Sequence, residues 1–129
     1  ATTVSTPLHE VVAGRRGVCQ DFAHLQLACL RSIGLAARYV SGYVRSAERS
    51  AAAADPLVGA DASHAWVSLW CGSRLGWVDL DPTNNMIPTD GHVVLAWGRD
   101  YGDVTPLRGV ILGGGEQTIE VAVHARPTG

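Results

Sequence analysis

The chain has 129 residues, a length that predicts one domain built around a single hydrophobic core. Hydrophobic residues make up 47% of the sequence and charged residues 17%, which indicates a compact body rich in apolar side chains. The formal net charge is -2 and the 10 Lys and Arg residues form no basic run, which argues against binding to nucleic acid or to an anionic membrane.

The first predicted element is a helix. Residues 1–16 are polar and rich in turn-forming residues, and we interpret them as a lead-in segment. From Val18 onward, apolar residues recur at nearly helical spacing until Gly34 supplies a stop signal. This pattern predicts a helix over about residues 19–32, with Cys19 at its amino terminus.

A strand and a long loop are expected after the helix. Residues 36–44 are rich in aromatic and β-branched side chains, which favours a strand. Residues 45–62 sustain neither the helical nor the strand period. We interpret them as a surface loop, and the alternative is a lid beside the functional site.

The next two segments predict a β-hairpin. Residues 63–71 and 74–81 both alternate between apolar and polar side chains, and Gly-Ser at 72–73 fits a two-residue turn. With that turn, Val67 would pair with Val78 on an apolar inner face.

The same register places polar groups together on the other face of the hairpin. His64 would lie directly opposite Asp81. Asp79 shares this face but would oppose Trp66, so it is a diagonal neighbour of His64 and the reserve candidate for a carboxylate partner.

Further strands are expected in the carboxyl-terminal part of the chain. A turn at residues 82–85 precedes a strand at 92–97, and residues 98–106 are expected to form a loop. Residues 107–112 and 116–125 flank three glycines and are interpreted as the last strands of an antiparallel sheet.

Cys19 is the first candidate for a chemical role. A helix amino terminus lowers the pKa of a thiol because unpaired N–H groups and the positive end of the helix dipole favour the thiolate, which is the nucleophilic form. Without partners, a small buried cysteine would be the simpler interpretation. We keep that interpretation for Cys29 and Cys71.

Five histidines compete to act as the base for such a thiol. His24 lies roughly 140° around the helix from Cys19, so the two side chains diverge. Only His64 acquires a carboxylate partner by the geometry of the hairpin. His9 lies in the lead-in segment and His124 near the carboxyl end. His92 follows a turn and has no acidic partner in a defined register.

Four motifs in order point to a known family. They are GVCQDFAHL at residues 17–25, ARYVSGY at 37–43, SHAWV at 63–67 and GWVDLDPTN at 76–84. Together they resemble the core of the bacterial transglutaminase-like superfamily proteins, which are often described as cysteine proteases. The later segments GRDY and GGGEQT are also similar, so the resemblance covers nearly the whole chain.

The resemblance implies an α+β fold of the papain-like and transglutaminase-like type, in which the cysteine helix packs on an antiparallel sheet. It implies a catalytic triad with Cys19 as nucleophile, His64 as base and Asp81 as the acid that orients the histidine. Such an enzyme would transfer an acyl group from an amide or peptide bond, through a thioester, to water as a protease or to an amine as a transamidase.

Two further residues are candidates for the substrate site. Gln20 is considered as a second oxyanion donor beside the Cys19 backbone N–H. Trp66 either lines the acyl pocket or packs, and we favour packing. No cofactor and no metal are expected, since the acidic clusters of the calcium-dependent animal enzymes are missing. The alternative function is a non-catalytic peptide-binding module that retains the fold.

The cysteines and the first residue of the sequence bear on its location and its domain organisation. Three cysteines without a C-x-x-C pair predict neither a disulfide framework nor a structural zinc site, and they fit a cytoplasmic location. No stretch approaches the ~20 apolar residues of a membrane span. Because residue 1 is alanine, we expect residues 1–129 to be a single catalytic core domain from a longer protein. The expected partner is a peptide or protein amide, and the oligomeric state is left open.

Overall fold

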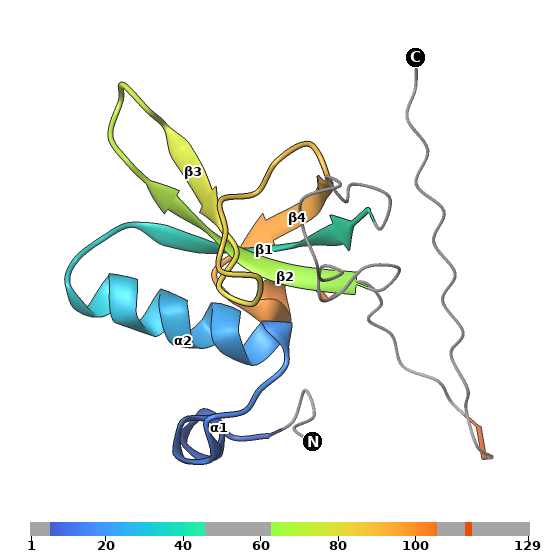
Figure 1. The fold of residues 1–129 in the computed structure, drawn as a ribbon. Coiled ribbons are helices and arrows are strands. Elements are labelled where there is room, and N and C mark those ends of the chain that lie inside the picture. Colours follow the sequence, from blue (N-terminus) through green and yellow to red (C-terminus); the bar gives the residue numbers. More distant parts are fainter. Residues whose placement is uncertain (1–5, 46–62, 106–112, 115–129) are drawn as a thin grey trace, which may run out of the picture.

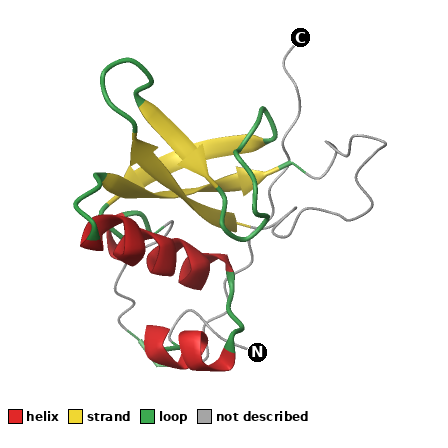
Figure 2. Ribbon diagram, turned by 60° about the vertical axis from the view of Figure 1, so that its left-hand side comes forward, coloured by secondary structure: helices red, strands yellow, loops and turns green. Residues whose placement is uncertain are grey.

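The computed structural model describes residues 6–45, 63–105 and 113–114. Four antiparallel strands form one sheet in the order β3-β2-β1-β4, and two α-helices lie on one side of it (Figures 1 and 2). The expected α+β architecture is therefore confirmed. The elements are α1 (Leu8–Gly14), α2 (Cys19–Ser32), β1 (Ala37–Val44), β2 (Ser63–Trp70), β3 (Trp77–Leu80), β4 (His92–Gly98) and the 3-10 turn η1 (Tyr101–Asp103).

The helix predicted over residues 19–32 is confirmed as α2. The segment interpreted as a lead-in, residues 1–16, contains a short helix that was not expected. Residues 8–14 form α1, whose buried residue Val11 anchors it beside α2, on the side away from the sheet (Figure 2). Pro7 stands just before α1 and Arg15 ends it in a left-handed conformation. The turn-forming residues of this segment thus mark the two ends of a short helix.

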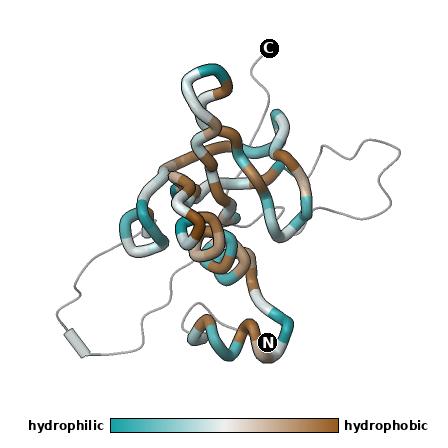
Figure 3. The backbone as a smooth tube through the Cα atoms, turned by 90° about the vertical axis from the view of Figure 1, so that its left-hand side faces the viewer, coloured by the Kyte–Doolittle hydropathy of each residue, from teal (hydrophilic) through white to brown (hydrophobic). Residues whose placement is uncertain are grey.

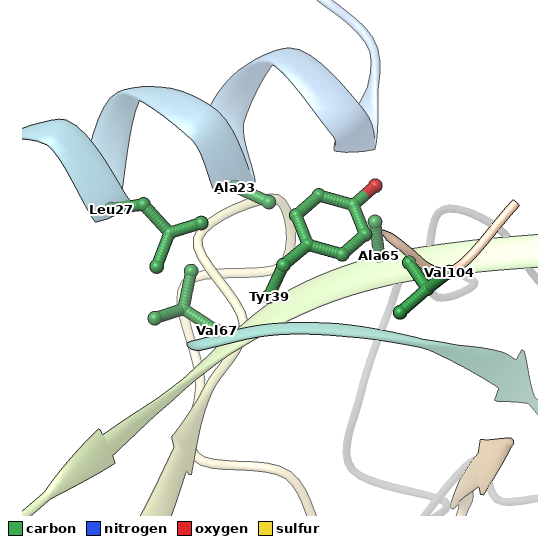
Figure 4. Close-up of a cluster of buried hydrophobic side chains, with 6 residues drawn as sticks. All are labelled: Ala23, Leu27, Tyr39, Ala65, Val67 and Val104. Atoms are coloured by element: carbon green, nitrogen blue, oxygen red, sulfur yellow. The ribbon is translucent and has the colours of Figure 1, made fainter. Parts of the chain in front are cut away.

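The hydrophobic core lies between α2 and the inner face of the sheet. Ala23 and Leu27, four residues apart and so on one face of α2, project toward Tyr39, Ala65 and Val67 of the central strands, with Val104 at one side (Figure 4). Figure 3 shows the hydrophobic residues gathered along the strands and alternating with hydrophilic ones along α2. This packing fixes where the amino terminus of α2 lies relative to β2.

The hairpin expected from residues 63–81 forms, but its register differs by two residues from the prediction. Val67 pairs with Leu80 instead of Val78, and Ser68 pairs with Asp79. Trp66 is therefore not directly opposite Asp79 in the strand pairing. His64 is also not directly opposite Asp81, since Asp81 follows the end of β3 and forms an isolated bridge with Met86.

The turn of the hairpin explains the difference. The Cys71 N–H donates to the Gly76 carbonyl at 2.8 Å, which leaves residues 72–75 as a four-residue loop in place of the two-residue turn. Gly72 and Gly76 take positive φ angles of 82° and 68°, which only glycine adopts at no steric cost. A slip of two residues preserves the face of every side chain, so the polar face predicted for the hairpin survives.

The strand expected at residues 92–97 is confirmed as β4, which pairs with the far edge of β1 through an irregularity between Ser41 and Gly42. The strands expected at 107–112 and 116–125 lie outside the described residues, as does the loop or lid expected at 45–62 beyond Arg45. Within the part of the chain that is described, no helix is long and apolar enough to cross a membrane.

Candidate active site

Cys19 is the first residue of α2. The side chain of Asp21 accepts the Val18 N–H at 2.9 Å and so closes the first turn. The thiol is half-buried and packs against the core cluster between α2 and the sheet. It therefore lies at the end of the helix where the free N–H groups and the positive end of the dipole favour a negative charge.

The surroundings of the thiol favour its ionised form. Burial alone would raise the pKa of Cys19, but the His64 imidazole and the backbone N–H groups of Ala65 and Gln20 outweigh burial. The pKa of the thiol consequently falls below its ordinary value of 9.0. β2 and α2 both contribute to this effect, so the nucleophile depends on the packing of the helix against the sheet.

His64 is the second residue of β2, and its Nε2–H donates to Asp81 Oδ2 at 2.8 Å with both side chains fully buried. Burial opposes the charged imidazole, but the hydrogen bond to Asp81 and the neighbouring Cys19 outweigh it and raise the pKa of His64 to about 9. The other ring nitrogen, Nδ1, is buried and has no partner that meets the distance and angle of a hydrogen bond. It is the nitrogen left to face the thiol, and such pairs are commonly loose before substrate binds.

Asp81 is held at both oxygens. Oδ1 accepts the backbone N–H groups of Thr83 at 2.9 Å and Asn84 at 3.1 Å, in the turn that follows β3. Oδ2 accepts from the Asn84 side chain at 2.7 Å, from His92 Nε2 at 3.0 Å and from His64. Burial would raise the pKa of this carboxyl, but these donors hold it well below its usual range.

These three side chains form a charge arrangement suited to thiol chemistry. An ionised Asp81 can only accept hydrogen bonds, so it requires the proton of His64 on Nε2. The raised pKa of His64 and the lowered pKa of Cys19 together favour a thiolate beside an imidazolium near neutral pH. The structure thus brings together all three residues that the sequence singled out.

Two residues of this cluster were missed from the sequence: His92 and Asn84. Asn84 follows Asp81 closely, and the pattern Asp-Pro-Thr-Asn is typical of a turn capped by the aspartate, so a local signal existed. His92 was judged to have no acidic partner, and that judgement was wrong, because the β1–β4 pairing brings it to Asp81. No sequence pattern reveals that pairing or its irregularity at Gly42.

The weaker candidates occupy different places. Trp66 is fully buried, and its indole N–H donates to Asp79 at 3.0 Å, so this side chain packs. Asp79 therefore accepts a hydrogen bond from Trp66 and is not the carboxylate that contacts His64. The backbone N–H of Gln20 lies at the thiol and lowers its pKa.

The rival cysteines and His24 lie elsewhere. His24 Nε2 accepts the Tyr101 N–H at 3.3 Å, and its ring rests on Tyr39. Cys29 is exposed on α2 and Cys71 is half-buried beside the hairpin loop, so the interpretation of both as small buried cysteines is wrong. His9 lies on α1, and His124 is outside the described residues.

The cluster also contains groups that bind metals. The ligand atoms of His64, Asp81 and His92 lie within 4.8 Å of one another, and two imidazoles with one carboxylate suit zinc or iron. Here both imidazoles meet the same carboxylate oxygen at hydrogen-bond distances, 2.8 and 3.0 Å, and Asn84 adds a third donor. The hydrogen-bond network accounts for this geometry without a cation.

Comparison with known proteins adds a family and several relatives. A family model described as the transglutaminase-like superfamily matches residues 1–82. An uncharacterized protein of Mycobacterium tuberculosis is 47% identical over 131 residues, covering 98% of this chain and 41% of the relative. An uncharacterized protein of Mycobacterium leprae is 46% identical over 109 residues, covering 84% of this chain and 37% of the relative. The chain thus spans about two fifths of the length of these relatives.

A solved structure is similar as well. It is the crystal structure of a protein from Cytophaga hutchinsonii described as a putative cysteine protease, with a TM-score of 0.61 and 31% sequence identity. The similarity covers 81% of this chain and 32% of that one.

Proposed function

The chain belongs to the transglutaminase-like superfamily, and from this premise we propose that it is a thiol-dependent acyl-transfer enzyme acting on amide bonds, with Cys19, His64 and Asp81 as its catalytic triad. The observation that carries the proposal is the buried 2.8 Å hydrogen bond between His64 and Asp81 beside a thiol whose pKa is lowered. The likeness to a protein described as a cysteine protease supports the same class of chemistry.

The first half of the reaction forms an acyl-enzyme. The Cys19 thiolate attacks the amide carbonyl carbon, and the carbonyl oxygen takes up negative charge in a tetrahedral intermediate. The proton on His64 Nδ1 passes to the nitrogen of the leaving amine as the C–N bond breaks, which leaves a thioester on Cys19. Asp81 keeps its hydrogen bond to Nε2–H and stabilises the charged imidazole until that transfer.

The second half releases the acyl group. A nucleophile gives its proton to the now neutral Nδ1 of His64 as it attacks the thioester, and the Cys19 thiolate leaves. With water the product is a carboxylic acid, and with an amine it is a new amide. Hydrolysis and transamidation therefore share every group of the triad and differ in which nucleophile reaches the thioester.

The amino terminus of α2 supports stabilisation of the oxyanion. The first N–H groups of a helix have no intrahelical acceptor, and Cys19 itself contributes the first of them. An oxyanion formed on the carbon bonded to the Cys19 sulfur would lie next to this N–H. We assign the Cys19 backbone N–H as one oxyanion donor and keep Gln20 as the candidate for the second.

A cavity that borders the core cluster is a candidate site for the acyl group. It has a volume of about 410 Å³ and is lined in part by Val104, which belongs to the same core cluster that Cys19 packs against. Tyr43, Leu95 and Thr105 give it both apolar and hydroxyl surface. Such a mixed lining fits a peptide side chain.

Alkylation of the thiols tests the proposal. At pH 6 a cysteine with the ordinary pKa of 9.0 is only roughly 0.1% thiolate. We expect iodoacetamide to modify Cys19 at least tenfold faster than Cys29 or Cys71, as followed by peptide mass spectrometry, and His64→Ala to abolish the difference. Slow and equal labelling of all three thiols would contradict the proposal and favour a peptide-binding module that retains the fold.

A further inference from the structure

We propose that His92 is a positioning residue of this site: its Nε2–H holds the Asp81 carboxylate in the orientation that aligns His64 with Cys19. The inference rests on the proposed function and assigns a role to a histidine that never touches the thiol. It makes the acid of the triad the centre of a His–Asp–His arrangement contributed by β2, the turn after β3, and β4.

The geometry at Asp81 is the first observation. The Nε2 atoms of His64 and His92 lie 2.8 and 3.0 Å from the same oxygen, Oδ2, and the His92 side chain is 2% exposed. Because the ionised carboxylate can only accept, both imidazoles present N–H to it. His92 therefore donates a buried hydrogen bond, strengthened by charge, to the oxygen that orients His64.

The second observation is the packing of Trp66 against His92. The indole of Trp66 meets the His92 ring edge to face, at 5.2 Å between centroids and 88° between planes, and its other neighbour is the His64 ring at 6.0 Å. The indole N–H is fixed by Asp79. A Cβ on Gly42 would lie 2.6 Å from the indole, so this glycine leaves the space that Trp66 fills.

These contacts separate His92 from the other donors to Asp81. Thr83 and Asn84 belong to the turn that carries Asp81, so their hydrogen bonds move with it. His92 is on a different strand, paired with β1, and ties the carboxylate to the body of the sheet. Without its N–H, Asp81 would keep its charge but lose this anchor, and the His64 ring would be free to turn away from the thiol.

The test uses variants that separate the N–H from the ring. His92→Phe keeps an aromatic ring against Trp66 but cannot donate, whereas His92→Gln places an amide N–H near the position of Nε2. We expect the rate of Cys19 alkylation at pH 6 to fall about tenfold in His92→Phe, with the acid limb of its pH profile shifted upward, and to recover in His92→Gln. The other ionisable groups near the thiol, Tyr39 and Asp21, are unchanged in both variants.

Several outcomes decide the matter. A purely structural role would lower the melting temperature of both variants and leave the pH profile in place, and that result would overturn the proposal. If His92→Phe does not fold, His92→Asn replaces it, since its amide is one methylene too short to reach Asp81. Equal profiles for the Asn and Gln variants would then overturn the proposal. The wild-type protein and His64→Ala separate the two proposals. If Cys19 of the wild type is alkylated rapidly at pH 6, His64→Ala loses this reactivity and His92→Phe keeps it, the role of His92 is refuted while the proposed function stands.

Discussion

At the scale of the residue, the main feature of the candidate site is the hydrogen bonding of Asp81. Five hydrogen bonds converge on one buried carboxylate, two from backbone N–H groups and three from side chains. Those bonds keep it ionised, and against the burial that lowers the pKa of His64, the hydrogen bond to Asp81 is the largest influence that raises it. A charged imidazole in turn favours the Cys19 thiolate, so the reactivity of the thiol depends on a residue it does not touch.

Removing the negative charge of Asp81 tests whether it controls the pKa of His64 and the reactivity of Cys19. In Asp81→Asn the amide carries no charge, so we expect the pKa of His64 to fall from about 9 toward its ordinary value and the thiolate to lose its partner. Cys19 alkylation at pH 6 should slow at least tenfold, as measured by mass spectrometry. Asp90→Asn, which alters an exposed carboxylate, is the matched control and should behave as wild type. Equal slowing of both variants would contradict the account.

Single residues also show how far sequence reasoning reached. Cys19 and His64 could be selected because each stands at a recognisable position, the start of a helix and the start of a strand. The parity of the hairpin narrowed the acid to Asp79 and Asp81, which share the face of His64, and the family resemblance favoured Asp81. The contact of Cys19 with His64 is a tertiary contact between a helix and a strand, which spacing along the chain does not determine.

Among the elements, the hairpin shows why a wrong register still predicted a correct contact. The sequence suggested a tight turn, but the glycine at position 76 closes a four-residue loop and moves every pair by two residues. Since side chains alternate with a period of two, His64 and Asp81 stay on one face, and the side chains bridge the remaining offset at 2.8 Å. A slip of one residue would have separated them onto opposite faces.

The pairing of β1 with β4 is the part that sequence could not supply. Both strands were predicted, but nothing in either fixes which edge β4 joins or where the register shifts. The register shift between Ser41 and Gly42 sets the position of His92 along β1, and the missing Cβ of Gly42 leaves room for Trp66. The place of His92 in the site therefore could not be predicted without the strand pairing.

Gly42→Ala tests whether this irregularity supports the site. The added Cβ would collide with the Val93 carbonyl oxygen and the Trp66 ring, so we expect the free energy of unfolding to fall by about 1–3 kcal/mol and Cys19 alkylation to slow. Gly14→Ala is the control, because no atom lies within 4 Å of its added Cβ. Urea denaturation of both variants measures the effect, and equal stability of the two would contradict it.

At the scale of the molecule, the core and the site share one interface. α2 packs through Ala23 and Leu27 onto the central strands, and the same contact sets its first residue, Cys19, beside β2. The α+β class and the central elements could be predicted because periodicity and turn residues are local signals. α1 could not, because its seven residues are too few to show a helical period.

The coupling of the site to folding predicts a dependence of stability on pH. The folded pKa of His64, about 9, lies above the value near 6.5 of an unfolded histidine. Its contribution is therefore fully present below pH 6.5 and is lost as the pH rises toward 9. A Cys19→Ser background removes the ionisation of the thiol and its share of the shift but keeps the share of Asp81. In this background we expect the free energy of unfolding to fall by on the order of 1 kcal/mol within the window.

His64→Gln in the same background supplies the comparison. Glutamine does not titrate, so this part of the pH dependence should disappear from urea unfolding curves recorded between pH 6 and 9.5. Identical slopes in the two proteins would mean that His64 is not held in its charged form by the fold.

The central claim is that Cys19 becomes acylated, and covalent trapping tests it most directly. The protein is mixed with a library of peptide amides, quenched in acid within seconds, and digested for mass spectrometry. We predict an acyl group on Cys19 as a thioester cleaved by hydroxylamine, with none on Cys29 or Cys71 and none in His64→Ala. Absence of any adduct on Cys19 across the library, in the longest form of the protein, would contradict the account.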